Sequence, residues 1–259
     1  MRELLKRLPS LQLQGLYTLN ARDIHTKTRR SLKSSNFDTT FDQLIEKIDQ
    51  HPANNNQLFD YMREQSKVGF TPAQYDGFRA NYFARTIGTA DAVTKALSRA
   101  IKEENNQAIV EIGGNLADES GVKGPEGDNH PQLLKDSFNI LGRRVFGLPV
   151  INFKDASKSP YLLPEIVQYR KMQNSVYADS SPWPTIAGCM YLHEKLAYPM
   201  LVNIFEHLVK PYQGYFEDKP EQWQRICKYF DAHIQVGDNG VRNCAEITNP
   251  INRRLASIF

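Results

Sequence analysis

Residues 185–210 read TIAGCMYLHEKLAYPMLVNIFEHLVK, and this long, mostly apolar stretch decides the fold class. Its length and apolar character predict a helix rather than a strand. Pro199 should bend or end that helix, because proline removes a backbone hydrogen bond and clashes with the preceding turn. No stretch of the chain, this one included, reaches the roughly 18 consecutive apolar residues of a membrane span. We therefore expect a helix of a globular protein and no membrane partner.

Helical patterns recur on both sides of this stretch. Thr71 and Pro72 suit the start of a helix, because Thr caps free N–H groups and Pro at the first helical position sacrifices no hydrogen bond. The other predicted helices cover residues 40–50, 54–66, 71–102 with a loosening at Gly88, 105–119, 130–142, 163–177 and 220–246. Strand signals are weak, since no alternating β-branched run is bounded by tight-turn dipeptides. The sequence predicts an all-α fold, a helical bundle forming a single domain over residues 1–259.

Glycines add two expectations about these helices. Gly142 is expected to end the helix that begins at His130. Gly113 and Gly114 fall inside the predicted helix 105–119, where each costs roughly 1 kcal/mol relative to alanine. Because that cost needs a reason, the pair predicts close packing at this step.

Charge and cysteine content exclude several classes of function. The chain of 259 residues carries 32 basic and 29 acidic residues, for a net charge of +3. This balance gives no argument for nucleic-acid binding, which usually needs a clustered basic excess. Cys189, Cys227 and Cys244 form no CxxC pair, so we expect neither a disulfide framework nor a cysteine-based zinc site. This cysteine usage, with an N-terminus that lacks a continuous apolar stretch, predicts a cytoplasmic protein.

Carboxylates and histidines fall among apolar residues on several predicted helices. Glu111 and Glu119 share one helical stripe, Glu194 and His233 lie among apolar neighbours, and His130 follows a glycine-rich loop. A carboxylate that faces a core needs a partner, because an isolated buried charge is very costly. Two carboxylates and two imidazoles on successive helices match an iron or manganese site inside a bundle. Each residue could equally be a hydrogen-bonded core residue without a metal.

Three segments carry recognisable motifs. They read NLADESG at 115–121 followed by HPQLL at 130–134, GCMYLHEKLAYP at 188–199, and YFDAHIQV at 229–236. These segments resemble the heme-oxygenase-like diiron oxidases, which are related to the chlamydial protein associating with death domains. The resemblance implies a heme-oxygenase-like helical bundle with its core over residues 70–247. Residues 1–65 would form an N-terminal helical extension, for which no motif is found.

The resemblance also implies a set of metal ligands, namely Glu119, His130, Glu194 and His233. The family's last helix adds an acid and a second histidine, but Gly237 and Gly240 stand at those positions here. Asp238, one residue late, would replace the acid only if the helix were locally widened by a π-bulge. Since glycine offers no side-chain ligand, the cofactor is left open between two iron ions, one ion and none, with manganese as the other candidate metal.

The function implied is an iron-dependent oxidation or oxygenation of a small-molecule substrate, or of the protein itself. Tyr191, and beside it Tyr198, are candidate redox partners on the helix of Glu194. The glycine replacements favour a second interpretation, a catalytically inactive, metal-poor relative that acts as a binding protein. The same fold hosts thiaminase-II-like hydrolases with a cysteine nucleophile, for which Cys189 and Cys244 are candidates without a matching motif. Homodimers are common in the resembling families, although nothing in these residues demands one.

Overall fold

The structure is a computed structural model that describes residues 43, 46–51, 54, 56–122 and 128–234. The chain divides into two compact units, Met1–Pro52 and Ala53–Phe259. The first unit is described only over a short helical stretch around Ile48. All that follows concerns the second unit, so the single domain and the N-terminal extension stay predictions.

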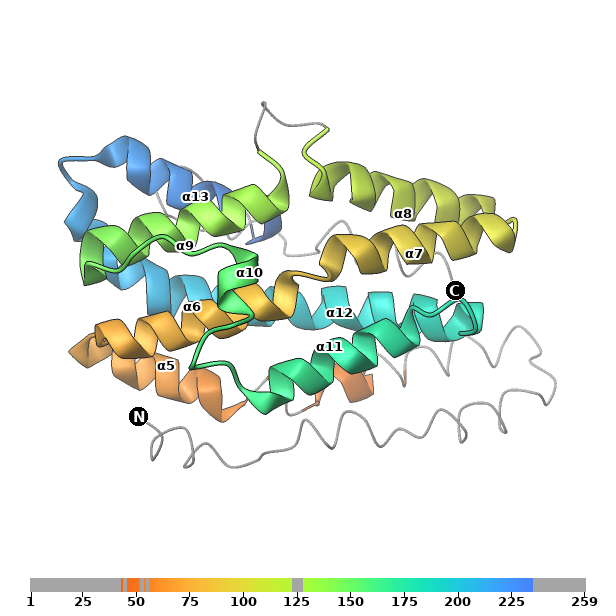
Figure 1. Cartoon of the computed structure of the whole chain (residues 1–259), viewed down its shortest axis with the longest axis horizontal. Helices are drawn as coiled ribbons and strands as arrows, with labels where there is room; N and C mark the ends of the chain where they lie inside the picture. Colours follow the sequence, from red (N-terminus) through yellow and green to blue (C-terminus); the bar gives the residue numbers. More distant parts are fainter. Residues whose placement is uncertain (1–42, 44–45, 52–53, 55, 123–127, 235–259) are drawn as a thin grey trace. The chain divides into compact units, whose positions relative to one another are not determined.

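The second unit is built from helices, and its described residues contain no strand. Figure 1 labels the elements, which are α5 Gln57–Val68, α6 Pro72–Thr86, α7 Thr89–Lys102, α8 Asn106–Glu119, α9 His130–Phe146, α10 Phe153–Ala156, α11 Pro164–Val176, α12 Trp183–Ile204, the π-helix η2 Phe205–Val209, the 3-10 helix η3 Lys210–Phe216 and α13 Pro220–Ile234. The predicted all-α bundle is confirmed over these residues. No helix in the described part of the chain is long and apolar enough to cross a membrane.

Side-chain caps fix where several helices begin. The Thr71 hydroxyl accepts a hydrogen bond from the Gln74 N–H, and the Gln74 side chain accepts one from the Thr71 N–H. This reciprocal capping box, with Pro72 in the first turn, confirms the predicted start of α6. At α9 the Asn129 side chain accepts from the Gln132 N–H at 2.8 Å, which places His130 in the first turn of that helix.

Two of the glycine expectations are wrong. Gly142 does not end α9, which continues to Phe146 and stops at Gly147, where φ is +65°. A left-handed residue is the usual helix terminator, and glycine takes that conformation without a steric penalty. A Cβ built at Gly113 or Gly114 would have no atom within 4 Å, so no close packing explains that pair.

Proline and glycine act differently in the two longest predicted helices. The predicted loosening at Gly88 is a break, since α6 ends at Thr86 and α7 begins at Thr89. Pro199 lies inside α12, which continues to Ile204, so the proline does not end the helix. Asn203 donates a hydrogen bond of 2.8 Å to the Pro199 carbonyl oxygen in the turn that follows.

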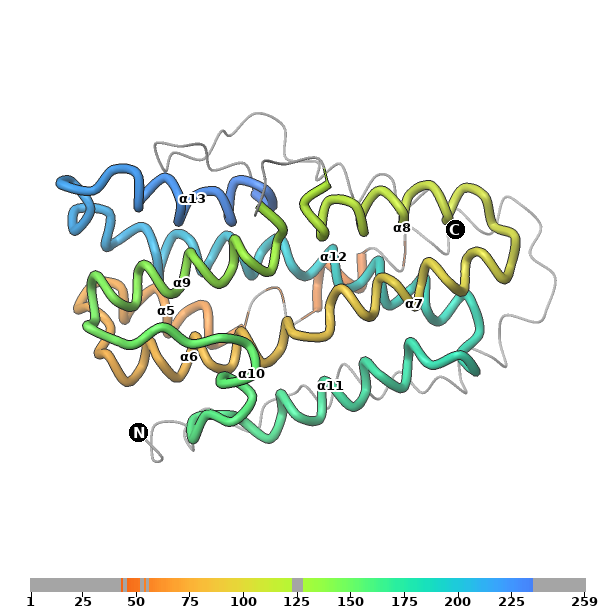
Figure 2. The backbone as a smooth tube through the Cα atoms, turned by 45° about the horizontal axis from the view of Figure 1, so that its top comes forward, coloured from red at the N-terminus to blue at the C-terminus, as the bar shows by residue number. Residues whose placement is uncertain are grey.

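Buried apolar side chains form two separate clusters. The first fills the space among α5, α6, α9, η2, η3, α13 and the C-terminal part of α12, with Phe83, Phe138 and Phe230 fully buried. The second joins α7, α8 and the N-terminal part of α12. In Figure 2, α9 lies beside α13 and α7 lies beside α8, in agreement with the contacts between these pairs. Since α12 contributes to both clusters, its middle passes from one core to the other.

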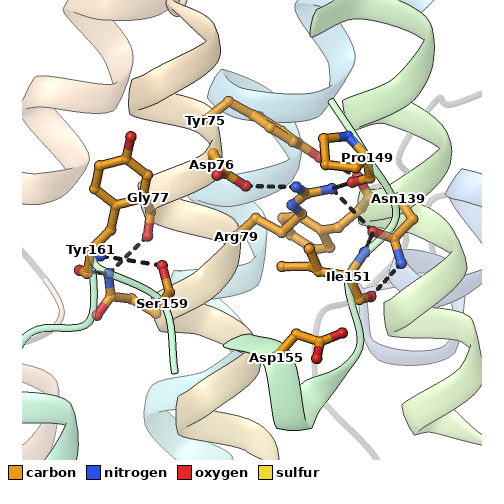
Figure 3. A network of polar contacts seen from close by, with 12 residues as sticks. Tyr75, Asp76, Gly77, Arg79, Asn139, Pro149, Ile151, Asp155, Ser159 and Tyr161 are labelled. Carbon is orange, nitrogen blue, oxygen red and sulfur yellow. Dashed lines mark hydrogen bonds and ion pairs between the residues drawn. The ribbon is translucent and has the colours of Figure 1, made fainter. Parts of the chain in front are cut away.

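A buried arginine ties α6 to α9 within the first cluster (Figure 3). The Arg79 side chain is 0% exposed. Its guanidinium donates to the Asp76 carboxylate at 2.6 Å and to both the Asn139 side-chain oxygen and the Pro149 carbonyl at 3.0 Å. A buried charge needs both an opposite charge and hydrogen bonds. This network supplies them to the Arg79 side chain of α6 inside the core.

Candidate metal centre

Three side chains from three different helices meet where the two clusters adjoin. Glu119 ends α8, His130 begins α9 and His233 lies in the last turn of α13. One ligand atom from each side chain lies within 4.8 Å of the others. The His130 Nδ1 lies 3.0 Å from the Glu119 Oε1, and the two imidazole rings have their centroids 4.6 Å apart.

Backbone contact orients His233 for coordination. Its Nδ1 lies 2.7 Å from the backbone oxygen of Tyr229, one turn earlier on α13. A carbonyl oxygen only accepts, so Nδ1 carries the proton and Nε2 keeps the lone pair that a metal needs. Histidine ligands are commonly fixed in this way through the ring nitrogen that does not bind the metal.

Glu119 and His130 stabilise the charged forms of each other. Burial alone would raise the pKa of Glu119, but its hydrogen bond with His130 and the charge of that ring lower the pKa overall. Burial works against the charged form of His130 as well, and the contact with Glu119 nevertheless raises its pKa. The charged pair therefore holds one proton on His130, and a metal ion would have to displace that proton.

The group opens onto a cavity of about 150 Å³. Its walls come from the end of α6, the start of α7, the end of α8, the start of α9, the middle of α12 and the end of α13. On α12, His193 and Glu194 lie between Met190 of the second cluster and Ala197, which packs against the first. The cavity thus occupies the junction of the two cores.

Glu194 lines this cavity without belonging to the group of three. Burial, and then the negative charge of Glu119, raise the pKa of Glu194 to about 7, although the Asn115 amide opposes the shift. A carboxyl group with this pKa exchanges protons near neutral pH, as general acids and bases do. Its assignment as a metal ligand stays a prediction.

His193 also lines the cavity, and the sequence analysis did not select it. Burial, and then the positive charge of Arg85, lower its pKa to about 3. Its Nδ1 lies 3.3 Å from the Tyr169 hydroxyl on α11. Its position next to Glu194 in the chain was the available signal, but neighbouring residues on a helix face different directions, so spacing alone gave no reason to choose both.

Two tyrosines reach the centre, and neither was selected from the sequence. The hydroxyl groups of Tyr82 and Tyr229 lie 2.8 Å apart, and the Tyr229 ring has its centroid 4.8 Å from that of His233. Tyr229 precedes His233 by one helical turn, which is a signal that the sequence offered. Tyr191 is buried, and neither it nor Tyr198 is among the residues that line the cavity, so their redox role stays a prediction.

The other candidates lie apart from this group or outside the described residues. Cys189 packs against the second cluster, and burial raises the pKa of its thiol, which disfavours the nucleophilic thiolate. Neither Cys189 nor Glu111 lines the cavity. Asp238, Gly237, Gly240 and Cys244 lie outside the described residues.

The chemistry of the donors fits a divalent transition metal. Two imidazoles and one carboxylate that leave coordination positions open are typical of ferrous sites, and the same donors accept manganese. The oriented His233 meets a further requirement of such a site, whereas the proton on His130 competes with the ion and makes its binding depend on pH. The three residues therefore fit one ion.

Comparisons with models of known protein families, with curated proteins and with solved structures found no match.

Proposed function

We propose that this chain is a heme-oxygenase-like, iron-dependent oxidase or oxygenase that acts on a small molecule held in the cavity. The observation that supports the proposal is the convergence of Glu119, His130 and His233 within 4.8 Å, at the wall of that cavity. The resemblance of the motifs at these three positions supports it independently.

A ferrous ion would supply the one-electron chemistry that activates dioxygen. The protein's own residues would do the rest. Glu119 provides the anionic ligand, His233 presents Nε2, and His130 gives up its proton when the ion binds. Apolar walls that include Leu134 and Phe153 limit the entry of water.

Glu194 would move a proton between the substrate and the cavity. Because its pKa is about 7, it holds a proton about half of the time at neutral pH and can both give and accept one. The ring of His193, whose pKa is about 3, is neutral at that pH and can only exchange hydrogen bonds.

One ion is favoured over two. Within the part of the chain that the structure describes, three donors lie together, whereas a complete diiron site has about six, and Gly237 and Gly240 add no donor in the sequence. The same glycines favour the second candidate function, a metal-poor binding protein that has kept the cavity and lost the reaction.

Anaerobic titration with Fe(II) tests the proposal. We expect the wild-type chain to bind about one equivalent, and Glu119→Gln, His130→Ala and His233→Ala each to weaken binding by about 100-fold or more. His207→Ala is the matched control, because His207 lies on η2 and does not line the cavity. Oxygen consumption with an added reductant then separates an oxidase from a protein that only stores iron.

Two results would overturn the proposal. The first is binding of less than about one-tenth of an equivalent of Fe(II) or Mn(II) by the wild-type chain. The second is binding that persists unchanged in all three ligand variants. Either result leaves the binding protein as the remaining function.

A further inference from the structure

We propose that the cavity takes a small organic monocarboxylate with a compact apolar body, and that Arg85 binds its carboxylate group. This inference names a substrate class for the proposed oxidase, so its place in a reaction rests on the proposed function. The binding itself can be measured without a metal.

Arg85 is a cation in the cavity wall that forms no ion pair among the described residues. It lies in the last turn of α6 and is half-buried. Its guanidinium carbon lies 5.3 Å from the centre of the Tyr169 ring on α11. No described residue accepts a hydrogen bond from it, and its charge lowers the pKa values of His193 and Glu194, which line the same cavity.

The geometry prepares this guanidinium for a planar anion. The cation–π contact with Tyr169 satisfies none of the five N–H donors of the guanidinium. A half-buried guanidinium gains from a partner, because burial weakens its contact with water. A carboxylate matches two parallel N–H donors of arginine at once, which makes it a fitting ligand.

A second donor lines the same cavity. The Asn115 side chain on α8 is 8% exposed, and its amide nitrogen has no described acceptor within hydrogen-bond geometry, although it is near enough to the Glu194 carboxyl to lower the pKa of that group. A ligand that accepts a hydrogen bond from this buried amide would satisfy it more fully. Arg85 and Asn115 are both donors, which favours an acceptor ligand.

The remaining wall sets the size and character of the ligand. Leu134, Phe153, Met200 and Leu201 provide apolar surface. A volume of about 150 Å³ resembles that of engineered cavities that hold benzene, so a ligand of about ten non-hydrogen atoms or fewer fits. Asp118 and Glu194 also line the cavity and would repel an anion when they are ionised, whereas the charge of Arg85, which already acts on Glu194, attracts one.

Calorimetric titration of the full-length, metal-free chain tests the inference. The probes are 3-methylbutanoate, hexanoate and benzoate, each compared with its uncharged amide. At least one carboxylate should bind, and its amide should bind at least about 10-fold more weakly. Arg85→Gln should weaken that carboxylate by about 10- to 100-fold and leave the amide unchanged. Arg63→Gln is the matched control, because Arg63 makes an exposed ion pair with Asp60 on α5.

The outcomes separate this inference from the proposed function. If none of the carboxylates binds, or if Arg85→Gln binds them as tightly as the wild type, the inference is overturned while Fe(II) binding stands on its own titration. If a carboxylate binds through Arg85 but the chain binds no Fe(II), the anion site stands and the oxidase fails. Arg85→Gln should itself bind Fe(II) like the wild type, because Arg85 is not among the three ligands.

Discussion

Two arginines on the same helix, Arg79 and Arg85, have opposite surroundings. Arg79 is fully enclosed and bonded to a carboxylate, an amide and a backbone carbonyl. Arg85 lines the cavity, contacts the Tyr169 ring and makes neither a hydrogen bond nor an ion pair among the described residues. The difference teaches that one residue type on one helix can serve stability in a closed core and ligand binding at an open junction. The contrast also separates two regions, the packed core around Arg79 and the cavity that Arg85 lines, and these two regions should respond differently to substitution.

The largest difference should come from removing each arginine. Arg79→Leu should lower the free energy of unfolding by about 3–5 kcal/mol, because it leaves the partly buried Asp76 carboxylate and the Asn139 side-chain oxygen without their donor. Arg85→Leu should change it by about 1 kcal/mol or less, since only the contact with Tyr169 is lost. Urea unfolding of the metal-free protein measures both, with Arg63→Leu as the surface control. Equal costs at the two positions would contradict the division.

Replacing Glu194 by a residue that cannot ionise should show how much stability the raised pKa of this carboxyl removes. The pKa of Glu194 rises from 4.5 to about 7 on folding. The unfolded chain therefore loses this proton first as the pH rises, and the wild type loses up to about 3 kcal/mol of stability between these two values. Glu194→Gln cannot ionise and should escape this loss.

Unfolding in urea at about pH 5 and about pH 8 measures the effect. The advantage of Glu194→Gln over the wild type should be small at the lower pH and largest at the higher one. Glu111→Gln is the control, because Glu111 is half-buried on α8 and does not line the cavity. An advantage that stays constant with pH would show that Glu194 ionises normally in the folded chain.

Two glycines inside helices should respond in opposite ways to replacement by alanine. A Cβ at Gly142 would lie 2.9 Å from an Arg79 nitrogen and 3.2 Å from a ring carbon of Tyr75, so Gly142→Ala should cost about 1–3 kcal/mol. A Cβ at Gly113 meets nothing within 4 Å, so Gly113→Ala should raise stability by up to about 1 kcal/mol. Thermal unfolding of both variants checks the signs, and the same sign for both would refute this account of the packing.

The smallest effect should come from the tyrosine pair beside the centre. Tyr229→Phe leaves the buried Tyr82 hydroxyl without its partner and should cost about 1 kcal/mol. Adding Tyr82→Phe should recover part of that loss, because no buried hydroxyl then remains unmatched. A double-mutant cycle on the free energy of unfolding measures the coupling, and strict additivity would mean that the two hydroxyls do not interact.

Local chemistry made much of the fold predictable. Thr71 and Pro72 mark a helix start by hydrogen-bonding rules that act over a few residues, and the structure follows them. Gly142 misled the prediction, because a glycine can end a helix or make room for a distant side chain, and only the position of Arg79 decides between the two. Pro199 was expected to bend or end its helix; α12 continues past it to Ile204, so the ending is wrong and the bend stays a prediction.

The candidate site was predictable only in part. The motifs selected Glu119, His130 and His233, which the fold does bring together. They gave no reason to select Arg85 or Asn115 as donors for a ligand, because that role depends on what surrounds the two side chains in space. Tyr191 was chosen because it precedes Glu194 on the same helix, and its role stays a prediction, whereas Tyr82 and Tyr229 line the cavity and were not chosen.

The most direct test of the central claim is anomalous diffraction at the iron edge from crystals grown anaerobically with Fe(II). We predict one strong peak within coordination distance of Glu119, His130 and His233, with the hydrogen bond between Glu119 and His130 opened to admit the ion. A peak at other residues only, or no peak with that hydrogen bond still closed, would contradict the claim that these three side chains form a metal centre.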